Sequence, residues 1–248
     1  EGLKNFYKIR TYDINESKCN STHREVCYKS NIIFICVPTP MRKSGECDIR
    51  ILKEAVAYIS FECENDPNKN KPILVIKSTV PPGTTERLNA MAPYCDICFS
   101  PEFLTEANSF EDFKNQSRII IGGPRPATGK VKQMFRKAFP TIPIVKTGTK
   151  TAEMVKYFTN CFLASKVTFA NQMFQICLDN NIDYDKVCEY ALYDERIGKS
   201  HLAVPGPDGD LGFGGHCFPK DLAAMISFGK LNDGDTSFLE SVQEFNDK

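Results

Sequence analysis

The chain has 248 residues, of which 42% are hydrophobic, so it is long enough to bury the core of one large or two modest domains. Its 31 Lys and Arg residues balance 31 Asp and Glu residues, and its longest apolar run, residues 32–37, is far shorter than a bilayer span. This composition excludes general disorder and does not favour binding to nucleic acid or to a membrane.

Eleven cysteines are scattered through the strand and helix patterns, and an odd number does not suit a secreted disulfide scaffold. We therefore expect reduced thiols in a cytoplasmic protein. Cys95 and Cys98 form a Cys-x-x-Cys pair without the second pair that a zinc site needs, so no metal is expected. The chain begins with Glu-Gly-Leu-Lys, without an initiator methionine or a signal peptide, which indicates a sequence lacking its true beginning.

Short β-branched runs alternate with helical patterns in the first part of the chain. The predicted strands are residues 8–12, 31–37, 73–78, 97–99, 118–122 and 142–145. After the second of them, Asp48 precedes apolar residues at helical spacing, and a polar loop over residues 64–71 ends that helix. The alternation predicts a Rossmann-like α/β domain, with a parallel sheet and crossover helices, over residues 1–146.

The pattern changes to helices from residue 147 onward. A long helix is predicted from Thr149 to about residue 180, and the remainder is helical apart from a Gly/Pro-rich loop over residues 205–215. We therefore predict a second, all-helical domain over residues 147–248.

Ligands of an open parallel sheet bind outside the carboxyl ends of its strands, so the residues after each run are candidates. These are Asp13, Pro38-Thr39-Pro40, residues 78–83 and residues 100–103. An acidic residue closing the second strand of a dinucleotide fold binds the adenosine ribose, and a Gly-rich phosphate turn lies about 20 residues before it. Counting back from Asp13 passes the start of the chain, so Asp13 alone also fits an ordinary turn aspartate.

The strongest local signal is residues 212–221, which read Gly-Phe-Gly-Gly-His-Cys-Phe-Pro-Lys-Asp. Pro219 before an apolar run predicts the first turn of a helix, which places Cys217 at the helix N-terminus. The helix dipole and Lys220 both favour the nucleophilic thiolate, and the glycines let a ligand approach the backbone. We interpret Cys217 as a nucleophile, and the structural alternative is a buried cysteine at a helix cap. His216 is not expected to act as its base.

Two further pairs are spaced by one helical turn. Lys156 and Asn160 share a face of the predicted long helix, near Glu153, and suit an oxyanion site, although a solvated face fits them as well. Glu102 and Glu106 follow a strand end, where one can act as a base through water or both can simply occupy a first helical turn.

Seven segments occur in an order that resembles the UDP-glucose/GDP-mannose dehydrogenase family of nucleotide-sugar dehydrogenases. They are residues 13–18, 37–40, 77–84, 100–106, 153–160, 196–198 and 212–221. Their local chemistry is unrelated, so coincidence does not explain the shared order, and the resemblance spans almost the whole chain. What the family has and this chain lacks is a first strand with its Gly-rich loop and a C-terminal nucleotide-binding domain.

The resemblance implies an NAD-dependent enzyme that oxidises the C6 alcohol of UDP-glucose twice, with two NAD+ in succession, to UDP-glucuronate. It implies that Cys217 adds to the intermediate aldehyde, that the thiohemiacetal loses the second hydride, and that the thioester is hydrolysed. It also implies a cytoplasmic homodimer joined by the central helices, with a product used in polysaccharide synthesis. Mannose and N-acetylhexosamine nucleotides are alternative substrates.

By the same resemblance the site residues form three sets. The catalytic set is Cys217, Lys156, Asn160, Asp221, Thr79 and Glu102. The NAD set is Asp13, Lys18, Val37, Thr79, Glu106 and Lys220. The substrate set is Phe103, Leu104, Lys156, Asn160, Arg196, His201, Phe213 and Gly214, with Arg196 reaching the sugar nucleotide across a dimer interface and His201 near the uracil. Lys156 and Asn160 would stabilise the oxyanion, Asp221 and Thr79 would hold a water, and Glu102 would be the base in hydrolysis.

Two other functions stay open from the sequence. A two-domain hydroxyacid dehydrogenase shares the plan and a Lys-x-x-x-Asn pair, but it transfers one hydride and needs no thiol, so the loop around Cys217 argues against it. The other alternative is a non-catalytic dimerisation remnant that kept the fold and lost the cofactor loop.

Overall fold

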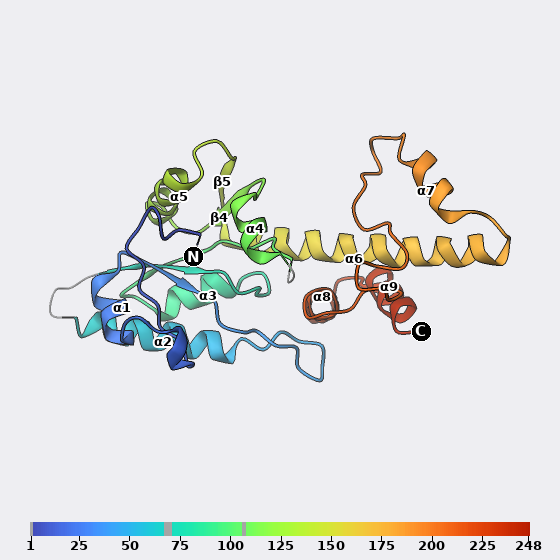
Figure 1. The fold of residues 1–248 in the computed structure, drawn as a ribbon. Helices are drawn as coiled ribbons and strands as arrows, with labels where there is room; N and C mark the ends of the chain where they lie inside the picture. Colours follow the sequence, from blue (N-terminus) through green and yellow to red (C-terminus); the bar gives the residue numbers. More distant parts are fainter. Residues whose placement is uncertain (1, 67–70, 106–107) are drawn as a thin grey trace. The chain divides into compact units, whose positions relative to one another are not determined.

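The computed structural model describes residues 2–66, 71–105 and 108–248, which form two compact units (Figure 1). The first unit comprises Glu1–Pro40 and Asp48–Lys156, and the second comprises Met41–Cys47 and Tyr157–Lys248. The long helix α6 (Thr149–Asp179) contributes to both. The domain boundary between residues 146 and 147 stays a prediction. Within the described residues, no helix is both long and apolar enough to cross a membrane.

The first unit contains a five-stranded sheet within the described residues. Its strands are β1 (Ile32–Ile35), β2 (Ile73–Ile76), β3 (Asp96–Phe99), β4 (Ile119–Gly122) and β5 (Ile144–Thr147), in the order β1-β2-β3-β4-β5. The first three strands run parallel, β4 is antiparallel to β3 through Phe99 and Gly122, and β5 is parallel to β4. A mostly parallel sheet with crossover helices confirms the predicted Rossmann-like α/β class.

Helices cover both faces of this sheet (Figure 1). The covering helices are α1 (His23–Lys29), α2 (Arg50–Glu64) and α3 (Thr84–Met91) on one face and α5 (Ala127–Ala138) on the other. The unit also contains the 3-10 helix Glu16–Lys18, which buries no residue, and α4 (Ser109–Lys114), which packs through Phe113. Alternate residues of β2 point to opposite faces, so Leu74 joins the cluster under α1, α2 and α3, while Val75 joins the cluster under α5. All four residues of β2 are buried, as expected for a central parallel strand.

The strand predicted over residues 8–12 is wrong, because these residues lie outside the sheet. The side chain of Asn20 bonds to backbone groups of this segment, as an adjacent strand would do in a sheet. Its side-chain oxygen accepts the Thr11 N–H at 2.8 Å, and its side-chain amide donates to the Ile9 carbonyl at 3.1 Å. The backbone groups of Thr11 and the carbonyl of Ile9 are thus bonded to a neighbouring turn, and a β-like composition does not by itself create a strand.

The second unit consists of helices, the loops that join them, and a separate short segment from earlier in the chain. It holds the rest of α6 with α7 (Tyr184–Ala191), α8 (Phe218–Leu231), α9 (Ser237–Asn246) and residues 41–47. Cys161, Leu222 and Val242 belong to the apolar cluster shared by α6, α8 and α9. The long helix from Thr149 and the helical remainder are confirmed, and residues 205–215 contain neither helix nor strand.

Glu153, in the second turn of α6, is a fully buried carboxylate that caps α3. Its Oε2 accepts the Gly83 N–H at 2.6 Å, and its Oε1 accepts the Thr85 N–H at 2.7 Å. Gly83 has a φ of +88°, a conformation that favours glycine, just before the helix begins. Burial raises the pKa of Glu153, while its hydrogen bonds to Thr85 and Gly83 favour the carboxylate. Glu153 therefore fixes the start of α6 to the start of α3.

Replacing Glu153 with alanine should lower the free energy of unfolding by about 2–4 kcal/mol, because two N–H donors at a buried helix end lose their acceptor. Urea denaturation followed by circular dichroism measures the change. The control is Glu86→Gln, since the carboxylate of Glu86 is half exposed and pairs with Lys150 at 3.1 Å. It should leave the urea midpoint almost unchanged, because an exposed ion pair contributes little to stability. An unchanged urea midpoint for Glu153→Ala would contradict the capping role.

Candidate active site

The loops after β1 and β2 are joined at the carboxyl edge of the sheet. The Ser78 hydroxyl donates to the Val37 carbonyl at 2.6 Å, and the buried Thr39 hydroxyl donates to the Thr79 carbonyl at 2.8 Å. The parallel register brings these two loops together, since both strands end at the same edge. Val37 and Thr79 thus lie in loops that are bonded to each other.

The loop after β3 carries Glu102 to α6. Its Oε1 lies 3.1 Å from Nζ of Lys156, and its Oε2 accepts the Leu104 N–H at 2.7 Å. The Lys156 side chain is 4% exposed and that of Glu102 is 28% exposed. A buried ammonium needs such a partner because its desolvation is costly. Lys156 therefore does not belong to a solvated face, and the structure pairs the predicted oxyanion-stabilising lysine with the predicted base.

The backbone around Glu102 differs from the expectation. Residues 100–105 are irregular, and α4 begins at Ser109, so Glu102 does not lie in a first helical turn, which was one of the two alternatives for it. Glu106 lies outside the described residues. Thr105 is bonded to the side chain of Asp112 in α4, since its N–H and its hydroxyl both donate to Oδ2, at 2.8 and 2.6 Å.

Phe103, predicted to line the sugar site, is close to two cations. The guanidinium carbon of Arg118 is 4.1 Å from the centroid of its ring, and Nζ of Lys156 is 5.7 Å from the same centroid. Both contacts favour a fixed ring orientation beside the Lys156–Glu102 pair.

The surroundings of Asp13 and Lys18 are compatible with the adenosine end of NAD. Asp13 is half-buried, and its Oδ1 accepts the Asn15 N–H at 2.8 Å, while its Oδ2 makes no hydrogen bond within the described residues. This oxygen suits the hydroxyls of an adenosine ribose. Lys18, the last residue of the 3-10 helix, is exposed and lies five positions after Asp13 in the chain. These residues fit the adenosine end of NAD, but the 248 residues contain no Gly-x-Gly-x-x-Gly phosphate turn.

In the second unit, Cys217 is the N-cap residue of α8, as predicted, and Pro219 lies in the first turn. Cys217 is half-buried, and its carbonyl accepts the Asp221 N–H at 2.9 Å. A side chain added at Gly214 would meet nothing within 4 Å, so space for a ligand adjoins the loop before it. The eleven cysteines, all among the described residues, are reduced thiols.

The buried carboxylate of Asp221, one helical turn after Cys217, joins α8 to α6. Nδ2 of Asn160 donates to Oδ2 of Asp221 at 2.6 Å, and Lys220 forms an ion pair with Oδ1. Asn160 and Asp221 are 6% and 1% exposed. Both oxygens of the carboxylate are therefore engaged, and Asn160 faces α8 rather than solvent. Lys220, predicted to bind NAD, is held here by Asp221.

The loop residue Phe213 is held by a residue that sequence reasoning missed. Oδ1 of Asn246 accepts the Phe213 N–H at 2.7 Å, and its Nδ2 donates to the Phe213 carbonyl at 3.0 Å. Asn171 adds a third bond, since its Oδ1 accepts the Gly212 N–H at 2.9 Å. A lone asparagine in a helix gives no sequence signal for this role.

The other predicted substrate residues are placed differently. The rings of Phe213 and His201 lie 6.1 and 5.7 Å from that of Phe218, so they share an aromatic cluster next to Cys217 in the chain. Arg196 is exposed and forms a forked ion pair with Asp194. The structure thus gathers His201 and Phe213, and it leaves Arg196 on the surface.

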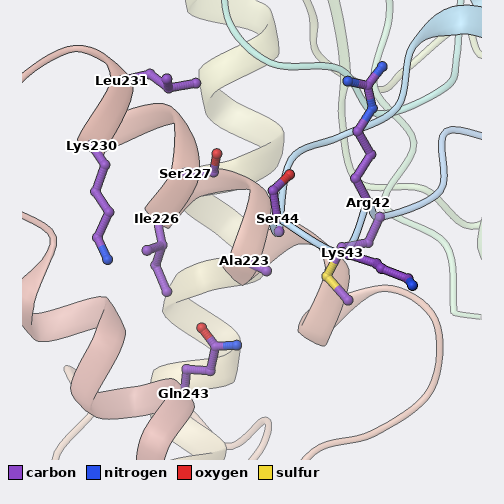
Figure 2. A pocket seen from close by; sticks show the side chains of 11 residues that line it. Arg42, Lys43, Ser44, Ala223, Ile226, Ser227, Lys230, Leu231 and Gln243 are labelled. Carbon is purple, nitrogen blue, oxygen red and sulfur yellow. The ribbon is translucent and has the colours of Figure 1, made fainter.

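A separate groove of about 540 Å³ lies in the second unit between residues 41–47 and α8 (Figure 2). Two of its cations already have partners, because Arg42 is 3.7 Å from Glu46 and Lys230 is 2.5 Å from Glu240. None of the predicted site residues lines this groove, so it is not the candidate active site.

Both parts of the chain match the model of one known protein family. Residues 3–139 match the NAD binding domain of the UDP-glucose/GDP-mannose dehydrogenase family, and residues 150–248 match its central domain. The chain belongs to the UDP-glucose/GDP-mannose dehydrogenase family. Both the predicted family and NAD as its cofactor are thereby confirmed.

Members of this dehydrogenase family with curated names are similar over most of the chain. It is 34% identical over 226 residues to UDP-glucose 6-dehydrogenase TuaD of Bacillus subtilis, which covers 88% of this chain and 47% of that relative. It is 35% identical over 245 residues to UDP-glucose 6-dehydrogenase of Rickettsia bellii, which covers 95% and 54%. The chain spans about half the length of these relatives.

Solved structures of the family share the fold. A UDP-glucose dehydrogenase from Pyrobaculum islandicum superposes with a TM-score of 0.79 at 31% identity, over 91% of this chain and 52% of the other. A UDP-D-ManNAc dehydrogenase from Pyrococcus horikoshii gives 0.74 at 25% identity, over 92% and 52%. These dehydrogenases act on different sugars according to their titles, so the fold alone does not select the hexose.

Cys217 should react with iodoacetamide at about pH 7.5 at least about tenfold faster than Cys98 or Cys161, because alkylation requires an accessible thiolate. Burial raises the pKa of both comparison thiols to about 12. Peptide mapping by mass spectrometry after timed quenching gives the three rates. Equal rates, or faster labelling of Cys161, would contradict a reactive thiol at the start of α8.

Proposed function

We propose that the chain carries the catalytic residues of an NAD-dependent nucleotide-sugar 6-dehydrogenase that converts UDP-glucose to UDP-glucuronate. The observation that carries this proposal is the half-buried Cys217 thiol at the N-cap of α8, one turn before the buried Asp221. A single-hydride hydroxyacid dehydrogenase needs no thiol there. The names of the curated relatives support UDP-glucose as the substrate.

In the first oxidation the C6 alcohol loses a proton and a hydride, and NAD supplies the hydride acceptor when it is bound. Asp221, whose carboxylate is fixed by Asn160 and Lys220, holds the water that receives the alcohol proton. Lys156, whose charge is partly balanced by Glu102, stabilises the oxygen as negative charge develops on it. The role of Thr79 at the same water stays a prediction.

In the second oxidation the Cys217 thiolate adds to the aldehyde carbon and forms a thiohemiacetal. Lys156 and Asn160 stabilise its oxyanion. Loss of a hydride from the same carbon leaves a thioester. Glu102 then takes a proton from water, the resulting hydroxide attacks the thioester carbonyl, and the carbon–sulfur bond breaks to return the thiolate and release the carboxylate product.

The chain's own residues account for part of the NAD site. Asp13 and Lys18 hold the adenosine half, with Oδ2 of Asp13 accepting from the ribose hydroxyls. Val37 and Thr79 lie at the sheet edge, where the remainder of the cofactor binds in such folds. The assignments of Glu106 and Lys220 to NAD stay predictions.

Purified protein with UDP-glucose and NAD+ should form two NADH for each sugar oxidised. Cys217→Ser should lower kcat about a thousandfold, because the hydroxyl does not replace the thiolate as nucleophile. The matched control is Cys188→Ser, a half-buried thiol of α7 that should leave kcat unchanged. Absorbance at the NADH band and mass analysis of the sugar product give both numbers.

The alternatives make different predictions in the same assay. Full turnover by Cys217→Ser with one NADH per substrate would favour the hydroxyacid dehydrogenase. No NADH from any nucleotide sugar, together with no saturation by NAD+ in calorimetry, would favour a non-catalytic remnant.

We also propose that a second copy of this chain covers α6. Phe158, Phe162, Phe169 and Ile176 are spaced by four, seven and seven residues, which keeps them on one face of the helix. All four are between 46% and 71% exposed, and the first two rings stack at 6.4 Å. An aromatic stripe of this length on one helix is typical of an interface between subunits.

The double substitution Phe162→Glu with Phe169→Glu should convert a dimer to monomers, because two carboxylates would be buried in an apolar contact. Size-exclusion chromatography with light scattering measures the mass. Leu231→Glu, at a residue of α8 that is 70% exposed, is the control and should leave the mass unchanged. A wild-type protein that is already monomeric at micromolar concentration would refute the dimer.

A further inference from the structure

Lys77 is a half-buried lysine that the proposed mechanism does not use. It follows β2 directly, and its Nζ donates to the carbonyl of Pro101 at 3.0 Å. Pro101 is itself buried and immediately precedes Glu102 in the loop after β3. A side chain from one strand end therefore holds the backbone of the next loop.

Three titratable groups interact electrostatically with the Lys77 ammonium. They are the thiol of Cys36 after β1, the carboxylate of Glu102, and the ammonium of Lys156 on α6. Burial lowers the pKa of Lys77 to about 8. Cys36 and Glu102 oppose this shift, and Lys156 adds to it. Two lysines thus act on one short segment, one bonded to the Glu102 carboxylate and the other to the peptide group before it.

We propose that Lys77 is a positioning residue for thioester hydrolysis, whose ammonium anchors the Pro101 carbonyl and so holds the Glu102 carboxylate against Lys156. The inference rests on the proposed function of Glu102 as the base in that step. The Pro101–Glu102 peptide is planar and the ring of Pro101 fixes its φ, so anchoring this carbonyl restricts the backbone on which Glu102 is mounted. A charged donor makes this bond stronger than a neutral one would.

The chain offers matched variants for a test. Lys77→Met removes the ammonium and keeps a long side chain, Lys77→Arg keeps a charged donor, and Lys146→Met alters an exposed lysine of β5. Circular dichroism and thermal melting first establish that each variant is folded.

The activity readout separates the oxidation steps from hydrolysis. In rapid-quench experiments with UDP-glucose and NAD+, Lys77→Met should form NADH within about twofold of the wild-type rate but hydrolyse the Cys217 thioester about tenfold more slowly. Intact-protein mass spectrometry should show the accumulated acyl-enzyme. Lys77→Arg should stay within about threefold of wild type, and Lys146→Met should match it. Equal slowing of NADH formation and hydrolysis by Lys77→Met would overturn the positioning role.

The pH dependence supplies a readout that a merely structural lysine would not give. Below about pH 8 the Lys77 ammonium is present, and above it the charge is lost. The hydrolysis rate of the wild type relative to that of Lys77→Arg should therefore fall as the pH rises through 8, while the gap between wild type and Lys77→Met narrows. A constant ratio to Lys77→Arg across this range would contradict the proposal.

A second readout does not depend on turnover. The Leu104 N–H donates to Glu102, so its hydrogen–deuterium exchange reports where the carboxylate lies. We expect exchange in residues 100–105 to rise about tenfold in Lys77→Met and to stay unchanged in Lys146→Met. Unchanged exchange in Lys77→Met would overturn the anchor even if the enzyme is active. Absence of turnover in the wild type would instead refute the proposed function, and the exchange would still decide whether Lys77 positions Glu102.

Discussion

The second unit depends on one buried carboxylate, that of Asp221. A carboxylate that is 1% exposed is tolerated only when both of its oxygens are bonded, and Asn160 and Lys220 provide those bonds. Since Asn160 belongs to α6, the pairing fixes where α8 begins relative to that helix. The backbone bond from Asp221 to the Cys217 carbonyl then sets the position of the thiol. The place of the Cys217 sulfur thus follows from the need to satisfy a charge one turn away.

The first unit applies the same constraint to cations. Lys156 is buried against Glu102, and Lys77 is held nearby on the Pro101 carbonyl. Two ammonium groups with one carboxylate leave a positive excess at this end of the sheet. Such an excess suits a reaction whose intermediates carry negative oxygen, because preorganised charge needs little reorganisation when the oxyanion forms. Another buried carboxylate of this unit, Glu153, has a structural role, because it caps the start of α3.

The sequence predicts features whose cause is local. β-branched runs predict the strands from Ile73 and Ile119, and proline in a first turn predicts the N-terminus of α8. Prediction fails where the deciding partner is elsewhere. The composition of segment 8–12 is typical of a strand, but it does not show that Asn20 bonds to Ile9 and Thr11, and nothing in the sequence shows that Thr105 bonds to Asp112.

The roles of side chains are likewise predictable where their cause is local and unpredictable where the partner lies far away in the chain. The spacing of Lys156 and Asn160 indicates a shared helix face, but their burial depends on Glu102 and Asp221, which lie 54 and 61 positions away in the chain. Lys77 bonds to a backbone carbonyl 24 positions away, and every residue type supplies such an acceptor. No pattern of residue types marks that partnership.

The side-chain amide of Asn246 bonds to the peptide groups on both sides of Phe213. It accepts the N–H and donates to the carbonyl, as a neighbouring strand would. The last turn of α9 and the loop before Cys217 are therefore held together, although 33 positions separate the bonded residues. A tilt of α9 would strain two hydrogen bonds at once and shift the ring that packs edge-on against Phe218. The placement of the segment that leads to Cys217 therefore depends on the far end of the chain as well as on α8, whose first turn follows it.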